Sequence, residues 1–229
     1  MLEHETPSPQ RARRGMALRR RDIVNLVLLL AIVAGVLTQV IHGPAAFKAP
    51  GGSAATQTSR YEGLTVGNPK TAPPLVLKNY LGATVNIDHY RGKAVLVTFL
   101  YTHCPDICPL ITSKLHTAVS EMSASERSEV QIIAVSVDPR GDTPTTVAQF
   151  LADHGMTGKM KYLIGSASAL GAVWSHWGIG SKREAGDPQL VSHTALVYGI
   201  TAKGRIVTIY PSTFHPSQIV HDVPVLAST

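Results

Sequence analysis

The sequence predicts an α/β fold with a partly parallel central sheet, preceded by one transmembrane helix. Two near-continuous apolar runs, 94–100 and 130–137, have the composition of strands that are buried on both faces of a sheet. Each run is followed by a segment whose apolar residues recur at helical spacing. A third, uncharged run of 19 residues at 23–41 is long enough to cross a membrane.

The membrane segment comes first along the chain. As a helix, residues 23–41 span about 28 Å, which is close to the hydrocarbon thickness of a bilayer. Six arginines precede this segment, so the positive-inside rule places residues 1–22 in the cytoplasm and the domain on the extracytoplasmic side, periplasmic or extracellular. A cleaved signal peptide is the alternative, because small residues follow at 43–46. The long basic region and long apolar run favour an uncleaved, single-pass anchor.

Residues 42–66 are predicted to form a flexible linker, because most of them are Ala, Gly, Ser, Thr or Pro without periodicity. Residues 67–229 then make one globular domain. The net charge of +6 looks basic, but from residue 43 onward 15 Lys and Arg face 12 Asp and Glu. That balance is an ordinary surface charge, so we expect no nucleic-acid partner.

Within the domain the pattern predicts a β-hairpin followed by alternating strands and helices. Short runs at 75–77 and 83–87 flank Gly82 and predict an N-terminal hairpin extension. The later elements are expected, in order, as a strand at 94–100, a helix at 110–122, a strand at 130–137, a helix at 145–154, a strand at 162–165, a helix at 167–177, strands at 194–200 and 205–210, and a helix at 216–223. This order of elements is typical of the thioredoxin fold.

The only two cysteines, Cys104 and Cys108, follow the strand 94–100 and open the next helix. Their separation of four residues predicts that both sulfurs lie on one helical face, where they can meet each other or a single ion. The positive end of the helix dipole lowers thiol pKa values there. A disulfide across so short a loop stabilises a fold by only about 2 kcal/mol, so this pair indicates chemistry rather than stapling.

Three short motifs stand out along the domain: YTHCPDICP at 101–109, VSVDPRGDTP at 135–144 and SHT at 192–194. In this order they resemble the motifs of the SCO/SenC family, membrane-tethered copper proteins that serve cytochrome oxidase assembly. The matching positions run from about residue 75 to about residue 219. The resemblance independently implies a thioredoxin-like fold.

The resemblance also implies a copper site made by Cys104, Cys108 and His193. Thiolate and imidazole are ligands that suit monovalent copper. Asp138 follows the strand 130–137 at the same sheet edge and is a candidate for tuning copper or binding it transiently. The family commonly has an aspartate before the histidine, whereas this chain has Ser192, so either a contact that supports copper binding or a charge used in partner docking is expected to be weakened.

Other residues near the motifs are assigned supporting roles. His103 adjoins Cys104, but neighbours in an extended segment point to opposite sides, so we interpret it as a modulator or a solvated residue. Asp142 is expected to cap the helix that begins with Thr143-Pro144. Asp106 either caps the cysteine helix or is solvated, and the second reading is favoured. Finally, two residues are expected to pack rather than bind, namely Trp174 and Trp177.

Two functions remain open. The first is a copper metallochaperone that delivers the ion to the binuclear copper centre in the copper-bearing subunit of cytochrome c oxidase. The second is an enzyme, an extracytoplasmic thiol-disulfide oxidoreductase that uses Cys104 and Cys108 as a redox-active pair on other copper or thiol-redox proteins. Three residues between the cysteines, and no proline at 191–193, favour copper. No arginine is clearly placed to activate a peroxide, which disfavours a peroxidase.

Overall fold

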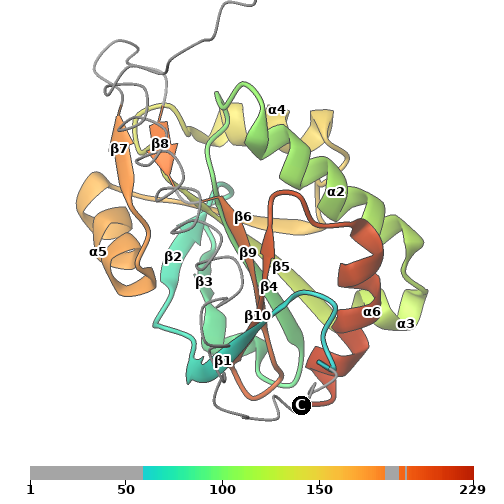
Figure 1. Cartoon of the computed structure of the whole chain (residues 1–229). Helices are drawn as coiled ribbons and strands as arrows, with labels where there is room; N and C mark the ends of the chain where they lie inside the picture. The colour runs from blue at the N-terminus through green and yellow to red at the C-terminus, as the bar shows by residue number, and fades with distance from the viewer. Residues whose placement is uncertain (1–58, 184–190, 194) are drawn as a thin grey trace, which may run out of the picture. The chain divides into compact units, whose positions relative to one another are not determined.

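The computed structural model describes residues 59–183, 191–193 and 195–229 (Figure 1). The predicted basic N-terminus and transmembrane helix, and the linker as far as residue 58, lie outside these ranges. Within them, no helix has the length and apolar character needed to cross a membrane.

The described residues form a mixed eight-stranded sheet in the order β1-β10-β9-β4-β5-β6-β2-β3. Its parallel centre consists of β4 (Ala94–Leu100), β5 (Val130–Ser136) and β6 (Met160–Ile164). Antiparallel strands flank this centre: β1 (Leu64–Thr71), β2 (Val76–Asn79), β3 (Thr84–Asn86), β9 (Leu196–Ile200) and β10 (Arg205–Pro211). All seven residues of β4 are buried, which explains why this strand is apolar on both faces.

Helices cover both faces of the sheet. Figure 1 shows α2 and α6 packed together on one side, with α5 on the other. The α-helices are α2 (Ile107–Glu121), α3 (Ala124–Ser128), α4 (Pro144–Asp153), α5 (Ala167–Trp177) and α6 (Pro216–Ala227), and a 3-10 turn η1 covers Ile87–Tyr90. These bounds confirm the predicted thioredoxin-like α/β order, and β2 and β3 confirm the hairpin extension.

Tryptophan packing in α5 agrees with the sequence interpretation. The Trp177 ring lies 5.8 Å from that of Phe99 and 5.6 Å from that of Tyr198, measured between ring centroids. The indole nitrogen of Trp174 donates a hydrogen bond of 2.9 Å to the carbonyl of Ser136. Both side chains therefore join α5 to the sheet.

Two features differ from the sequence analysis. Strand β1 begins at Leu64, inside the segment 42–66 that we predict as linker, and pairs with β10 at the edge of the sheet. Its sequence, LTVGNPKT, is polar and carries Gly and Pro, as edge strands often do, so it has no clear strand pattern. In addition, β7 (Ser181–Arg183) and β8 (Val191–His193) form a small antiparallel sheet that the sequence analysis did not predict, whereas the strand expected at 194–200 is present as β9.

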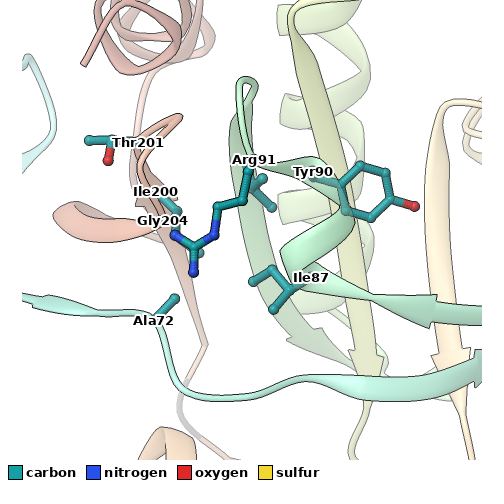
Figure 2. Close-up of a pocket in the computed structure, with 8 residues that line it drawn as sticks. Ala72, Ile87, Tyr90, Arg91, Ile200, Thr201 and Gly204 are labelled. Carbon is teal, nitrogen blue, oxygen red and sulfur yellow. The ribbon is translucent and has the colours of Figure 1, made fainter.

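Arg91 anchors the turn between β9 and β10 at the end of the sheet opposite the cysteines (Figure 2). Its guanidinium donates to the Asp88 carboxylate at 2.7 Å and to the carbonyl of Lys203. Gly204 lies directly against this guanidinium and has a φ of 76°. A Cβ atom at this position would overlap the Arg91 guanidinium, so any larger residue would strain the turn and displace that side chain.

Gly204→Ala is therefore expected to destabilise the protein. A left-handed backbone costs a residue with a Cβ about 1–2 kcal/mol, and displacement of Arg91 adds to that cost. Urea unfolding followed by circular dichroism measures the loss. Gly67→Ala is the matched control, because no atom lies within 4 Å of its Cβ position. Equal stability of the two variants would contradict this account of the turn.

Candidate metal and thiol site

The site is built at the carboxyl edge of the parallel strands. Strands β4 and β5 pair without a register shift from Ala94 with Val130 to Leu100 with Ser136. They therefore end at the same level, and the segments that follow them meet at one edge of the sheet. Open α/β sheets bind ligands at this edge.

Cys104 and Cys108 lie together at the start of α2. Cys108 is in the first turn of the helix, and its backbone N–H donates to Sγ of Cys104 at 3.3 Å. Cys104 itself precedes the N-cap residue Asp106, so the prediction that both sulfurs share a helical face was wrong in its geometry. The thiols meet instead because the turn before the helix folds Cys104 back over the helix start. Both are buried, free thiols.

Asp106 has the capping role that the sequence analysis considered but did not favour. Its side chain is exposed and accepts a hydrogen bond from the backbone N–H of Ile107. One of the otherwise unpaired N–H groups at the helix start is thereby satisfied. Asp106 is therefore both exposed and a cap, so preferring solvation to capping was wrong, because the residue directly before the helix can do both.

The two thiols differ in acidity. A hydrogen bond from the Cys108 thiol, supported by bonds from backbone N–H groups and the Tyr101 hydroxyl, lowers the pKa of Cys104 to about 6 against the opposing effect of burial. The same bond, burial and the charge of Cys104 raise the pKa of Cys108 far above its ordinary value. At neutral pH Cys104 is therefore mainly a thiolate, while Cys108 keeps its proton.

His193 comes to this pair from strand β8. Its Nε2 atom lies 3.8 Å from Sγ of Cys108, although the two residues are 85 positions apart. Its ring packs edge-on against Tyr101, with the ring centroids 5.8 Å apart. An open pocket of about 260 Å³ adjoins them, lined by Tyr101, Cys104, Asp106, Ile107, Val191, Ser192 and His193.

The three predicted ligands therefore gather at one edge of the sheet. The 3.8 Å between Cys108 Sγ and His193 Nε2 fits a hydrogen bond that involves sulfur. It is also about the separation of two ligands of one trigonal ion, because metal–sulfur and metal–nitrogen bonds are about 2.3 Å and about 2.0–2.1 Å long. In the described part of the chain, however, no group of three or more His, Cys, Asp or Glu is already arranged around one ion position.

Asp138 lies at the same edge, as predicted, and is almost fully buried at 2% exposure. Its carboxylate accepts a hydrogen bond of 3.2 Å from the backbone N–H of Arg140. A Cβ atom on Gly141 would lie 2.4 Å from Asp138 Oδ2 and 3.0 Å from Nδ1 of His103. The carboxylate therefore lies close to His103, whose side chain is exposed as expected.

Asp142 does not cap α4, so that prediction was wrong. The N-cap is Thr143, whose hydroxyl accepts from the backbone N–H of Thr146 at 3.2 Å. Asp142 instead points inward, where it accepts from the backbone N–H of Thr102 at 2.8 Å and from the Tyr162 hydroxyl at 2.8 Å. Burial raises the pKa of its carboxyl group.

Sequence reasoning therefore missed the residues that hold the cysteine loop, namely Asp142, Tyr162 and Tyr101. Asp142 and Tyr101 lie inside the motifs 135–144 and 101–109, and this position was the only indication in the sequence that they belong to the site. Their hydrogen-bond partners are far away in the sequence, so their roles could not be inferred from spacing.

The sequence model of the SCO1/SenC family matches residues 65–228. Among related sequences, the SCO2-like protein of Rickettsia felis is 23% identical over 205 residues, which cover 87% of this chain and 95% of that protein. The human mitochondrial SCO2 homologue is 31% identical over 140 residues, covering 58% of this chain and 51% of that protein. The chain thus spans about half the length of the human relative.

Solved structures share the fold. Apo Sco1 from Thermus thermophilus is 27% identical with a TM-score of 0.63, covering 72% of this chain and 96% of that one. ScoI from Bradyrhizobium japonicum, solved with copper bound, is 27% identical with a TM-score of 0.58 over 69% and 99% of the two chains. A third, BsSco, belongs to the Sco family of cytochrome c oxidase assembly proteins, and a disulfide switch has been identified in it; it is 23% identical with a TM-score of 0.59 over 73% and 96%.

The unequal thiols predict a selective alkylation. Iodoacetamide attacks thiolates, so the rate at Cys104 should rise with pH through a midpoint near its pKa of about 6. Cys108→Ala should move this midpoint upward, because the Cys108 thiol makes the largest contribution to the lowered pKa. Mass spectrometry after timed labelling measures both rates.

Cys104→Ser is the control for this labelling. It leaves only Cys108, whose thiol is buried and should react slowly at neutral pH, because burial shields it from the reagent and raises its pKa without help from Cys104. A midpoint for Cys104 near the ordinary thiol pKa of about 8.5 would contradict the hydrogen bonding described here.

Proposed function

This chain belongs to the SCO1/SenC family, and from that premise we propose that it is a copper metallochaperone that binds copper through Cys104, Cys108 and His193. One observation carries the proposal: the His193 ring nitrogen lies 3.8 Å from the Cys108 sulfur, although His193 comes from a distant strand. Cys104 and His193 also line one pocket at the ligand-binding edge of the fold.

The donor set suits copper as cargo. Two sulfurs and one imidazole favour soft, monovalent copper over hard cations such as magnesium or calcium. Cys104 supplies a thiolate at neutral pH, whereas Cys108 must lose its proton when the ion binds. Copper binding should therefore release protons and strengthen as the pH rises.

The proposed recipient is the copper-bearing subunit of cytochrome c oxidase, to whose binuclear centre the ion would be delivered. This assignment is supported by family membership and by the oxidase-assembly role of the family to which BsSco belongs. Ser192 is exposed and lines the same pocket as His193. The family commonly has an aspartate at this position, and serine carries no negative charge. Docking of the recipient would therefore depend less on electrostatic attraction to residue 192.

A thiol-disulfide oxidoreductase is the second candidate, and the difference in acidity between the thiols favours it. The Cys104 thiolate would attack a partner disulfide, forming a mixed disulfide and releasing one partner thiolate. Cys108 would then lose its proton and attack the Cys104 sulfur. That step releases the second partner thiolate and leaves a Cys104–Cys108 disulfide, which an external thiol reductant must reduce before another cycle.

We also propose that the chain is a single-pass membrane protein. The uncharged run at 23–41 and the arginines before it support an anchor whose N-terminus is cytoplasmic. The domain would then face an oxidising compartment, periplasmic or extracellular, in which Cys104 and Cys108 need a reductant to stay able to bind copper.

The copper site is tested by a copper(I) titration of the reduced full-length chain in detergent against a competing chelator. The wild type should bind one ion per chain tightly. Replacing both cysteines by serine should abolish this binding, and His193→Ala should weaken it by roughly 10- to 100-fold, since one of three ligands is lost. His89→Ala is the matched control, because His89 is an exposed histidine of η1 at the other end of the sheet.

Other outcomes of the titration separate the candidates. Tight binding that His193→Ala does not change would mean that the third ligand is misassigned. Absence of competitive copper binding, together with rapid reduction of a disulfide substrate that Cys104→Ser abolishes, would identify the oxidoreductase instead of the metallochaperone.

The membrane proposal predicts how the full chain fractionates. It should stay in the membrane pellet after a carbonate wash, and its domain should be digested by protease added from the extracytoplasmic side. A variant that starts at residue 43 behind a cleavable export signal should be released into the soluble fraction. A mature wild-type chain that begins near residue 43 would show instead that the apolar segment is a cleaved signal peptide.

A further inference from the structure

We propose that Tyr101 is a positioning residue whose hydroxyl links the cysteine loop to the strand that carries His193. This inference rests on the proposed function, because it concerns the same donor set. The hydroxyl lies between the cysteine loop and strand β8, which are far apart in the sequence. Three observations support the assignment, one for each end of the link and one for the hydroxyl itself.

The first end of the link is fixed to the core of the sheet. Tyr101 directly follows β4 and is 1% exposed. The carbonyl of the preceding residue, Leu100, accepts from the backbone N–H of Val137 at 2.9 Å, which extends the pairing of β4 and β5 by one step. The Tyr101 side chain therefore begins at a buried position directly beside the hydrogen-bonded sheet.

The other end of the link is a short strand outside the main sheet. Strand β8 has three residues and pairs with β7, outside the main sheet. The backbone N–H of Val191, its first residue, donates to the Tyr101 hydroxyl at 3.3 Å. The ring of His193, its last residue, packs against the Tyr101 ring with an interplanar angle of 79°. Tyr101 thus touches both ends of β8.

The hydroxyl itself contacts one end of the link and influences the other. A phenol has one donor and can also accept. Here it accepts from the backbone N–H of Val191 at 3.3 Å, and after the Cys108 thiol and backbone N–H groups it further lowers the pKa of the Cys104 thiol. Phenylalanine would keep the ring contact with His193 but would leave the Val191 N–H, at a residue that is 5% exposed, without this acceptor. Only tyrosine therefore connects the thiol with the histidine strand.

This link makes a specific prediction for copper binding. Preorganised ligands bind more tightly, because less conformational freedom is lost when the ion binds. Tyr101→Phe should weaken copper(I) binding by roughly tenfold, about the effect of one hydrogen bond. In a His193→Ala background the same substitution should have clearly less effect, because the histidine that Tyr101 positions is gone.

The experiment is a double-mutant cycle on the full-length reduced chain, with Tyr101→Phe, His193→Ala and both together, titrated with copper(I) against a chelator. Tyr90→Phe is the matched control, because it removes the hydroxyl of a partly buried tyrosine that lies outside the site. The proposal would be overturned if Tyr101→Phe lowered the copper(I) affinity equally in the wild type and in the His193→Ala variant. It would also be overturned if Tyr101→Phe did not lower that affinity at all.

A second readout needs no copper. Hydrogen exchange at the Val191 amide of the reduced, metal-free protein should be at least about tenfold faster in Tyr101→Phe and unchanged in Tyr90→Phe, since the amide loses its acceptor. Unchanged exchange would overturn the positioning role. If the wild type lacks a copper site that depends on His193, the proposed function fails, and this exchange rate still decides whether Tyr101 holds β8.

Discussion

The parallel pairing of β4 with β5 is the constraint on which the rest of the site depends. Both strands are apolar because helices cover both faces of the sheet, and their ladder runs without a bulge from one end to the other. A slip of one residue would turn every side chain to the opposite face. The register therefore makes both strands end side by side. The motifs 101–109 and 135–144, which follow these strand ends, are brought together as a result.

Hydrogen bonds to the Asp142 carboxylate hold the cysteine loop against the second motif and β6. The carboxylate accepts two hydrogen bonds from Thr102, in the cysteine loop, and one from Tyr162 on β6. Three donors offset the cost of burying the carboxylate, although burial still raises its pKa. The cysteine loop is thus held by the second motif as well as by its own helix, which explains why the two motifs belong together.

The same geometry reconciles the two candidate activities. Cys104 lines the pocket as a thiolate, and Cys108 lies beneath it as a protonated thiol. A thiolate is both a ligand for soft metals and the species that is oxidised or attacks a disulfide. A protein that carried copper on this pair would have to keep it reduced, so reversible oxidation would accompany either proposed activity.

The sequence by itself determined the α/β order, the N-terminal hairpin and the position of the two thiols after a buried strand, because periodicity and turn residues act over a few neighbouring positions. Only the tertiary structure decided that Asp142 faces inward, that Tyr101 reaches Val191, that His193 lies on a separate small sheet and that β1 completes the edge. These features depend on contacts between residues far apart in the chain. Local pattern carries no information about such contacts until the sheet register brings the partners together.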